Sequence, residues 1–494
     1  MRTNYLLALL SSALLVLAFP GVNFAWLAAF ALAPLLVAVG REPRPLHRFL
    51  LGYAAGVAYW FGVCYWIQFV LSYHGGLGDP LGWALFLLFC LAKAAHLGVF
   101  AWLAGHTLRG WWAVPGTAAL WVAIEVTHGY LGFAWLALGN AGIDMALPLR
   151  LAPYTGVWGL SFVFMMMATA LALALLRRPR LHLAWLLILP FLIFLPRLPD
   201  ARRARETAVL VQPNISEAAE WTPVSVERMH RELVTLTMRA VGSEEDGGRR
   251  PSIVAWPEVP APLYYEDDPR FRDYANGLAR ATGAWLLAGV VAHTPDGAPL
   301  NSAQLVSPAG EPVSRYDKVN LVPFGEFVPW PFGFANKIST EVGDFRAGNR
   351  IVVSKVDAHA MGAFICYESV FPDFVRRFPA GGAEVLFNLS NDGWFGKTAA
   401  REQHLRIVRM RAAENRRWIL RATNNGITAT IDSAGRLRGT LPSYVQAASL
   451  TGFTYIAEQT FYTRYGEWFP ILCAVIAAAI LLTRLRFRRI HSGK

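Results

Sequence analysis

The chain has 494 residues, of which 54% are hydrophobic and 16% are charged, and its mean hydropathy is +0.34. This balance is unusual for a wholly soluble protein, so part of the chain is expected to lie in lipid. The formal net charge of +12 could indicate nucleic-acid binding, but the arginines gather in short loops between apolar runs, where the positive-inside rule explains them better.

Eight apolar runs are long enough, allowing for ragged ends, to cross a bilayer. The first could instead be a secretory signal peptide, because Arg2 precedes it. No convincing small-residue cleavage site follows, however, and the second run comes almost at once, which favours a retained helix. The predicted spans are 5–20, 24–40, 50–72, 82–105, 111–128, 156–176, 182–197 and 467–484.

Arginines fall at alternate ends of successive apolar runs. The positive-inside rule then places both termini in the cytoplasm and residues 198–466 on the outer face. The arginines that set this orientation are Arg2, Arg41, Arg44, Arg48, Arg109, Arg177, Arg178, Arg180, Arg484, Arg486, Arg488 and Arg489.

The pattern within 198–466 changes to short runs rich in β-branched residues, separated by turn residues and by helix-like stretches. Alternation of this kind is typical of an α/β layered domain rather than an all-β one. The predicted strands are 207–212, 252–256, 285–291, 361–366 and 384–389, and the predicted helices include 225–241 and 399–417.

Cys366 ends the predicted strand 361–366 and is followed at once by Tyr367 and Glu368. The other three cysteines sit in apolar runs, so no disulfide is expected and Cys366 is a free thiol. A nucleophile is well placed at a strand end, because the sheet fixes its backbone while its side chain meets substrate. The alternative is a small apolar residue that caps a core strand.

Two charged residues could serve this thiol. Glu258 follows a predicted strand and lies between Pro257 and Pro260, so its carboxylate has little freedom and could act as a general base. Lys318 could stabilise the negative charge that develops on a carbonyl oxygen during attack. Taken alone, such a glutamate is more often a solvated turn residue, and most lysines lie on the surface.

Three motifs in chain order, 256–258 (WPE), 316–326 (YDKVNLVPFGE) and 366–368 (CYE), resemble the Glu-Lys-Cys arrangement of the nitrilase superfamily. The segments 388–396 (NLSNDGWFG) and 421–428 (RATNNGIT) resemble more particularly its membrane-bound members, the bacterial apolipoprotein N-acyltransferases. The resemblance covers nearly the whole chain.

The resemblance implies a membrane α-helical bundle of eight transmembrane helices plus an exported α/β nitrilase-like domain, built as an αββα sandwich. It divides the chain into a seven-helix transmembrane region at 1–197, a periplasmic catalytic domain at 198–466, and an eighth transmembrane helix with a basic cytoplasmic tail at 467–494. The implied location is the bacterial inner membrane.

The implied reaction is a ping-pong acyl transfer, the last step of lipoprotein maturation. Cys366 takes a fatty acyl chain from a membrane phospholipid as a thioester, and the chain then passes to the N-terminal α-amino group of diacylglyceryl-cysteine in an apolipoprotein. Glu258 would be the general base and Lys318 the oxyanion stabiliser. The implied partners are the phospholipid, the apolipoprotein and the bilayer, with no cofactor, no metal and a monomeric enzyme.

Four further residues match positions of the family. Glu326 and Glu368 would position Lys318 and the substrate amine, or assist proton transfer. Tyr367 would shape the acyl pocket, and Trp221 matches a tryptophan of a mobile loop. Each of the four also has an ordinary packing or surface interpretation.

Other signals are weaker. The aromatic stretch 323–334 is too broken by proline and glycine for a core element and is interpreted as an interfacial loop near the acyl entrance, with packing against the domain itself as the alternative. Glu125 and His128 lie one helical turn apart in a predicted span, and either serve a function or pair with each other. His404 has no Cys or His partner at ligand spacing, which argues against a metal site.

Two other functions stay open. A membrane-tethered amidase or nitrile hydrolase would resolve the thioester with water rather than with an amine. A transporter or scaffold could carry a catalytically silent exported domain, although the presence of all three triad residue types disfavours it.

Overall fold

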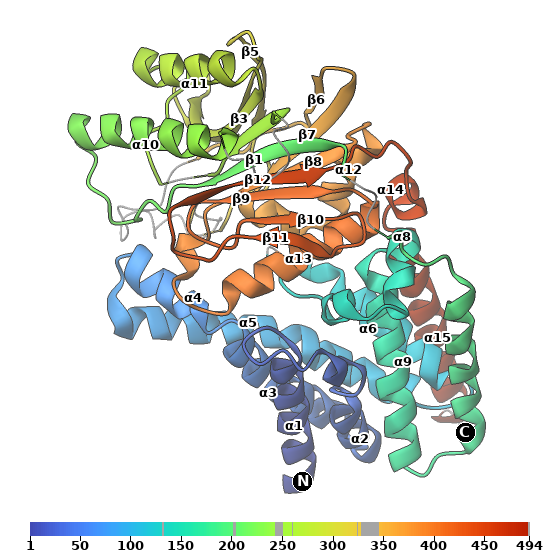
Figure 1. The fold of residues 1–494 in the computed structure, drawn as a ribbon. Coiled ribbons are helices and arrows are strands. Elements are labelled where there is room, and N and C mark those ends of the chain that lie inside the picture. The colour runs from blue at the N-terminus through green and yellow to red at the C-terminus, as the bar shows by residue number, and fades with distance from the viewer. Residues whose placement is uncertain are drawn as a thin grey trace.

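The computed structural model describes residues 1–130, 133–200, 204–242, 250–258, 260–323, 325–327 and 345–492. A helical part forms one end of the molecule and a layered α/β part forms the other (Figure 1). The start of the first helix and the end of the last lie at the end of the helical part that faces away from the sheets (Figure 1).

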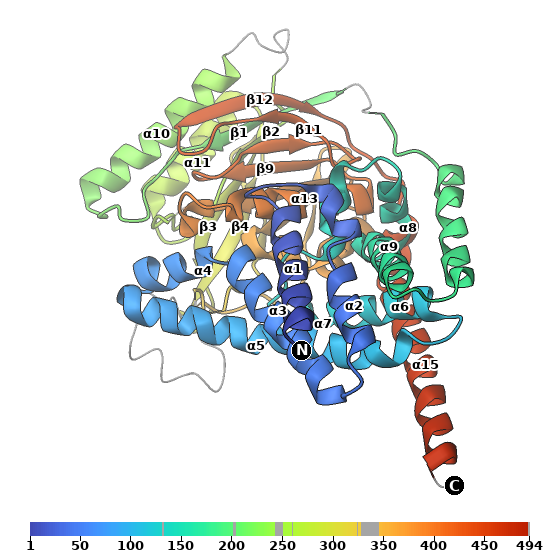
Figure 2. The same cartoon turned by 90° about the horizontal axis from the view of Figure 1, so that it is seen from below.

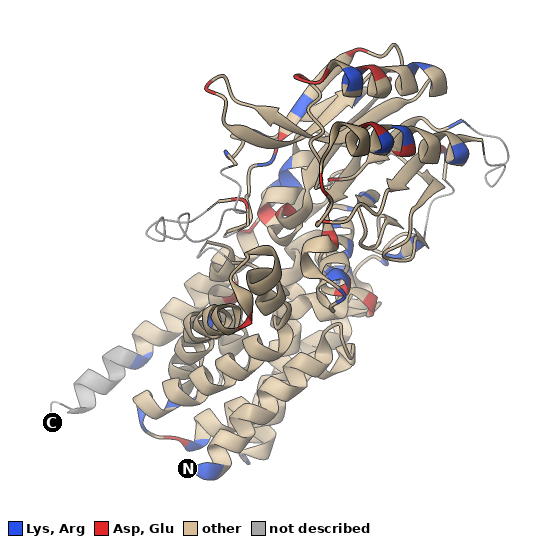
Figure 3. Ribbon diagram, turned by 90° about the vertical axis from the view of Figure 1, so that its left-hand side faces the viewer, with Lys and Arg blue, Asp and Glu red and all other residues tan. Residues whose placement is uncertain are grey.

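Most helices of the helical part are apolar, and charged residues are sparse along them (Figure 3). They are α1 (Arg2–Ala18), η1 (Ala25–Ala29), α2 (Ala33–Arg41), α3 (Pro45–Val63), α4 (Trp66–Phe69), η2 (Val70–His74), α5 (Gly78–Thr107), α6 (Ala113–Glu125), α7 (Thr127–Tyr130), η3 (Leu138–Asp144), η4 (Pro148–Leu151), α8 (Ala152–Thr155), α9 (Val157–Leu175), η5 (Arg180–Phe194) and α15 (Trp468–Ser492).

Each of the eight predicted spans overlaps helix in the described chain, but few of these helices are long. Within the described residues, α5 and α9 are long and apolar enough to cross a membrane, and α3 with the bent continuation Trp66–His74 would make a third. Shorter apolar helices cover Arg2–Ala18, Ala25–Arg41, Arg180–Phe194 and Trp468–Arg484. The number of eight spans therefore stays a prediction.

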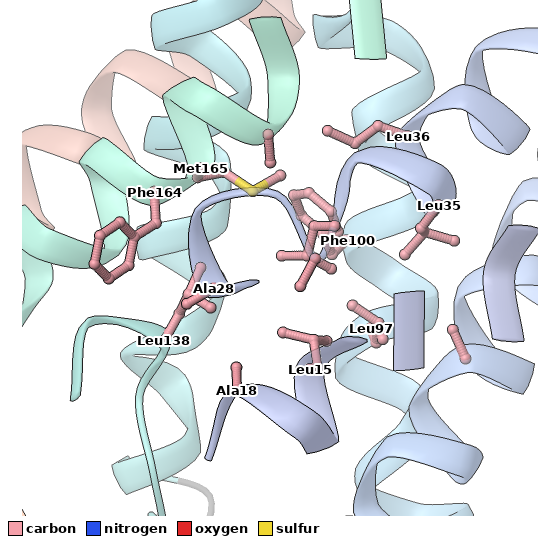
Figure 4. Packing of buried hydrophobic residues seen from close by; sticks show 14 of the residues in the cluster. Leu15, Ala18, Ala28, Leu35, Leu36, Leu97, Phe100, Leu138, Phe164 and Met165 are labelled. Carbon is pink, nitrogen blue, oxygen red and sulfur yellow. The ribbon is translucent and has the colours of Figure 1, made fainter. Parts of the chain in front are cut away.

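Close contact between α3 and α5 depends on small residues. A Cβ atom added at Gly52 would lie 2.3 Å from the carbonyl oxygen of Leu97, and one added at Gly56 would lie 2.8 Å from Cα of Ala94. Such a small-xxx-small pattern lets two helices in lipid gain van der Waals contact along their backbones. The neighbouring core includes Leu97 and Phe100 beside Leu15 of α1 (Figure 4).

The α/β part contains two six-stranded sheets, ordered β12-β1-β2-β3-β4-β5 and β11-β10-β9-β8-β7-β6. The first sheet has β1 (Glu206–Gln212), β2 (Ile253–Trp256), β3 (Trp285–His293), β4 (Pro299–Val306), β5 (Pro312–Asp317) and β12 (Ala447–Phe453). The second has β6 (Val353–Val356), β7 (His359–Ile365), β8 (Val385–Ser390), β9 (Ile419–Thr423), β10 (Ala429–Ile431) and β11 (Leu437–Thr440).

The two sheets pack face to face, and helices cover their outer faces. One apolar cluster joins residues of both sheets, including Leu210, Leu287 and Phe364. A second cluster lies between the first sheet and the helices α10 (Pro223–Val241) and α11 (Pro269–Thr282). The helices α12 (Pro372–Ala380) and α13 (Ala400–Asn415) lie on the second sheet. The predicted αββα layering is therefore confirmed.

α13 joins the α/β part to the helical part. Leu405 and Val408 pack on the second sheet. Ile407 and Met410 instead belong to apolar clusters with the helices of the helical part, called the membrane-side helices below. Figures 1 and 2 both place α13 between the strands and those helices. The remaining short helices are η7 (Cys366–Val370), η8 (Asp392–Phe395) and α14 (Phe461–Tyr465).

Candidate active site

The two sheets bring together the three residues that the sequence singles out. Glu258 follows β2 and Lys318 follows β5, both in the first sheet, whereas Cys366 follows β7 of the second sheet. β2 runs parallel to its neighbour β3, and β7 runs parallel to β8. The carboxyl ends of the strands in each pair therefore lie at the same edge of their sheet. Polar side chains that follow such strands therefore meet at that edge.

Lys318 is surrounded by carboxylates in the interior. Its side chain is 1% exposed, and Nζ lies 2.9 Å from Oε1 of Glu326 and 3.4 Å from Oε1 of Glu258. Burial alone would lower the pKa of Lys318, but Glu258 and Glu326 outweigh that effect and raise it above the ordinary value for lysine. The amine therefore stays positive at neutral pH.

Asn301 of β4 was not recognised from the sequence, yet it links the two carboxylates. Its Nδ2 donates to Oε1 of Glu258 at 2.6 Å and to Oε1 of Glu326 at 2.7 Å. The backbone N–H of Asn391 donates to the other oxygen, Oε2 of Glu258, at 2.9 Å. Little in the sequence distinguishes Asn301, because β4 also carries the polar side chains of Ser302 and Gln304.

Cys366 occupies a strained backbone position at the turn from β7 into η7. Its φ of 49° lies in the left-handed region, which a non-glycine residue seldom adopts. Burial raises the pKa of its thiol, as does the charge of Glu258, and together they outweigh the lowering by Lys318. The resting sulfur is therefore a neutral thiol, and a base has to remove its proton when it attacks.

Gly289 of β3 makes room for the segment that carries Glu258. A Cβ atom at this position would lie 2.4 Å from the carbonyl oxygen of Pro257 and 2.9 Å from the backbone nitrogen of Glu258. Both distances are shorter than van der Waals contact, so any side chain at residue 289 would displace the carboxylate.

With Cys366 as the nucleophile and Glu258 as the base that the sequence predicts, we expect Gly289→Ala to slow acylation of Cys366 roughly 100-fold while the protein still folds, because displacement of a catalytic group by about 1 Å costs that much. The rate of acylation, measured per folded molecule by intact mass, checks this. Gly277→Ala in α11 is the matched control, since nothing lies within 4 Å of a Cβ atom there. Equal rates in the two variants would contradict the assigned role of Gly289.

Glu368 is fully buried, and its carboxylate accepts four hydrogen bonds. Oε1 accepts from the hydroxyl of Tyr316 at 2.6 Å and from the backbone N–H groups of Val319 at 2.7 Å and Asn320 at 3.1 Å. Oε2 accepts from the N–H of Ile365 at 2.7 Å. Glu368 thus ties the chain after Lys318 to the end of β7, just before Cys366, rather than facing an open site.

The other two supporting candidates lie in different places. Tyr367 is buried between the two parts, with its ring centroid 6.2 Å from that of Phe133 in the helical part and 5.3 Å from that of Phe371, which precedes α12. Trp221 is half-buried against the cluster beneath α10, and no hydrogen bond or ring contact of the described residues joins it to the triad. Most of the predicted interfacial loop 323–334 lies outside the described residues.

Glu125 and His128 do not pair with each other. Oε1 of Glu125 accepts from the backbone N–H of Leu138 at 2.7 Å. His128 lies 2.6 Å from Nζ of Lys93, and its ring stacks on that of His96 with centroids 4.0 Å apart. Each side chain therefore ties its own helix to a neighbour.

A cavity of about 320 Å³ opens between the helical part and the α/β part. Its walls on the helical side include the aromatic rings of Trp60, Phe100 and Trp121. On the other side it reaches Val319, which follows Lys318, and Val370, in the short helix that starts at Cys366. A largely apolar space therefore comes within one residue of Lys318 and four residues of Cys366 along the chain, although the side chains of these two residues do not line it.

Comparison with known proteins assigns both parts of the chain. Residues 11–170 match the apolipoprotein N-acyltransferase N-terminal domain, and residues 208–449 match the carbon-nitrogen hydrolase family. An apolipoprotein N-acyltransferase from Geobacter metallireducens is 33% identical, over 99% of this chain and 97% of the relative. One from Azotobacter vinelandii is 32% identical, over 99% and 96%.

Solved structures of similar chains include a mutant of the Nesterenkonia amidase of the nitrilase superfamily, with a TM-score of 0.38 and 18% identity over 52% of this chain and 93% of that one. Nit3 of Saccharomyces cerevisiae gives a TM-score of 0.40 with 15% identity over 51% and 92%. The full-length matches decide the assignment: the chain belongs to the apolipoprotein N-acyltransferase family, within the nitrilase superfamily.

Proposed function

We propose that the chain transfers a fatty acyl group from a membrane phospholipid to the N-terminal α-amino group of diacylglyceryl-cysteine in apolipoproteins, through a thioester on Cys366. The observation that carries this proposal is the meeting of Glu258 and Lys318 with the strained Cys366 turn beside a cavity lined by membrane-side helices. The names of its relatives supply the acceptor class.

In the first half-reaction Glu258 takes the thiol proton as Sγ of Cys366 attacks the ester carbonyl carbon of the phospholipid. A C–S bond forms, and Lys318 stabilises the negative charge on the carbonyl oxygen. When the C–O bond breaks, the lysophospholipid leaves as an alcohol with the proton held by Glu258. The acyl chain then remains on sulfur.

In the second half-reaction the α-amine of the acceptor attacks the thioester carbon. The amine loses a proton to Glu258, a C–N bond forms, and the C–S bond breaks to release the thiolate, which takes the proton back. Glu326 positions Lys318 in both halves, since it holds Nζ at 2.9 Å. Tyr367, buried between the two parts, shapes the acyl pocket, and Trp221 belongs to the loop that covers the substrates.

The proposal places the protein in a bacterial inner membrane with eight spans. Residues 1–197 and 467–494 form the membrane part, and 198–466 form a periplasmic domain. Arg48, Arg109 and Arg178 line one small cleft at the end of the helical part, and Arg484 donates to the carbonyl oxygen of Arg109. Clustering of arginines at one end supports a cytoplasmic face there, with both termini beside it.

The test uses the purified full chain in mixed micelles of phospholipid and detergent. Intact mass should show one added acyl group, mapped to Cys366, together with an equal amount of lysophospholipid. A diacylglyceryl-cysteine peptide with a free amine should then remove the acyl group and become acylated, whereas the N-acetylated peptide should not.

Release of free fatty acid alone, at the same rate with either peptide, would instead identify a hydrolase. A protein that never acquires an acyl group would favour the transporter or scaffold. Each result excludes the proposed transferase.

A further inference from the structure

The imidazole of His404 lies beside the nucleophile and has no part in the reaction above. His404 belongs to α13 and is 0% exposed. Its Nε2 lies 3.1 Å from the carbonyl oxygen of Cys366 and 2.8 Å from the hydroxyl of Ser369. The ring therefore contacts the backbone of the residue whose sulfur reacts.

The other ring nitrogen faces a buried ion pair. Nδ1 lies 3.0 Å from Oδ1 of Asp392 and 3.2 Å from Nη2 of Arg421. The same Nη2 lies 2.8 and 2.6 Å from the two oxygens of Asp392, and the hydroxyl of Ser390 donates to that carboxylate at 2.9 Å. The Asp392 carboxylate is thus satisfied by donors other than the ring.

The contact of Nε2 with Cys366 depends on a proton at that nitrogen. The carbonyl oxygen of Cys366 can only accept, so a protonated Nε2 donates to it. At Nδ1 the carboxylate of Asp392 can accept and the guanidinium of Arg421 can donate, so the surroundings of Nδ1 are compatible with a proton at Nε2. Burial, followed by the charge of Arg421, lowers the pKa of His404, whereas Asp392 and the carbonyl of Cys366 act to raise it.

The Cys366 turn needs such support. A non-glycine residue in the left-handed region is strained and keeps its conformation only where the surroundings hold it. Glu368 holds the N–H of Ile365 just before the turn, and His404 holds the carbonyl of Cys366 just after it. These two hydrogen bonds hold the backbone on either side of the Cys366 side chain, and so they set the direction in which its sulfur points.

α13 is itself anchored in the helical part through the residue before His404. The side-chain oxygen of Gln403 accepts from the indole nitrogens of Trp135 at 2.7 Å and Trp66 at 3.3 Å, and its amide donates to the carbonyl of Val63 at 3.1 Å. Successive residues of one helix therefore contact the membrane-side helices and the nucleophile.

We propose that His404 is a positioning residue, which holds the Cys366 turn in the conformation that attacks the lipid ester and fixes that turn relative to the membrane-side helices through α13. This inference rests on the proposed role of Cys366 as nucleophile. It concerns the rate of acylation and not the binding of phospholipid, because His404 is fully enclosed and borders no part of the cavity described above.

The test compares His404→Leu, His404→Gln and the wild type in the full chain. Leucine fills the space without a donor, and we expect acyl-enzyme formation at saturating phospholipid to be roughly 100-fold slower. The half-saturating phospholipid concentration should stay within about threefold of the wild type. Glutamine can offer an N–H to the same carbonyl and should restore the rate to within about tenfold.

Asn415→Leu is the matched control for damage to α13. Asn415 is also buried in this helix, where it donates to the carbonyl of Arg411 and accepts from the hydroxyl of Thr463, but it does not touch the Cys366 turn. Per folded molecule, Asn415→Leu should acylate within about threefold of the wild type.

The inference is overturned if His404→Leu acylates at the wild-type rate, if glutamine gives no rescue over leucine, or if Asn415→Leu is slowed equally. In each of these cases the proposed function still stands if the wild-type protein forms the thioester on Cys366. A wild type that forms no thioester removes the proposed function, and this inference with it.

Discussion

Cys366→Ala should form no acyl-enzyme, and transfer of acyl groups to the acceptor peptide should fall at least about a thousandfold. The sulfur atom is the only part of the side chain that this change removes. Alanine keeps the Cβ atom, so the strain of the left-handed backbone at residue 366 is the same in both proteins. We therefore expect the variant to fold and to bind phospholipid normally.

Intact mass after incubation with phospholipid measures the acyl adduct, and the melting temperature reports folding. Cys473→Ala is the matched control, because Cys473 is equally a buried free cysteine but lies in α15. It should acquire one acyl group like the wild type. An adduct that persists on Cys366→Ala, or disappears on Cys473→Ala, would show that another group is the nucleophile.

Five of the twelve described strands of the α/β part were predictable from apolar, β-branched runs, namely β1, β2, β3, β7 and β8. The predicted runs 207–212, 285–291 and 384–389 coincide closely with β1, β3 and β8, because buried central strands show as apolar, β-branched segments. The other seven strands, which are β4, β5, β6, β9, β10, β11 and β12, fall outside the predicted runs. β11 is exposed along its whole length, so it carries no apolar pattern to detect.

The end of β7 shows how one residue changes the interpretation of a site. The predicted strand 361–366 includes Cys366, whereas the observed strand ends at Ile365 and Cys366 starts a 3₁₀ turn. No local residue preference indicates this end, since a positive φ is unfavourable for cysteine. Contacts from Glu368 and His404 support it: the first is local, three residues along the chain from Ile365, whereas the second comes from tertiary structure.

The proximity of Glu258, Lys318 and Cys366 was predictable because each lies in a short motif and the three motifs follow in a recognisable order. Asn301 and His404 were not assigned to the site, since an amide in a strand or an imidazole in a helix can have many structural roles. Their roles depend on which strand ends and helix faces the fold brings together. In the same way, the sequence places Trp221 near the substrates, whereas its described contacts are with the cluster beneath α10.

Glu258→Gln should slow acylation of Cys366 by a factor of about 10²–10⁴, the usual contribution of a general base. The three groups that contact the carboxylate, namely Nδ2 of Asn301, Nζ of Lys318 and the N–H of Asn391, are all donors. A glutamine amide must turn its own N–H₂ toward one of them. The variant therefore loses both the base and one hydrogen bond.

The same change should make the thiol easier to ionise, which separates a base from a residue that merely supports the fold. The charge of Glu258 contributes to the raised pKa of Cys366, so its removal should lower that pKa. Alkylation of Cys366 by iodoacetamide, followed by mass spectrometry against pH, should then shift to lower pH in Glu258→Gln while acylation collapses.

Glu384→Gln is the control for this pair of measurements. Glu384 lies just before the first residue of β8, where it pairs with His359 and not with a group of the candidate active site. Both its acylation rate and its alkylation profile should match the wild type. If Glu258→Gln lowered alkylation and acylation in parallel, the carboxylate would be needed to hold the sulfur in place rather than to accept its proton. Base catalysis by Glu258 predicts opposite movements, since the charge that hinders ionisation at rest also receives the proton during attack.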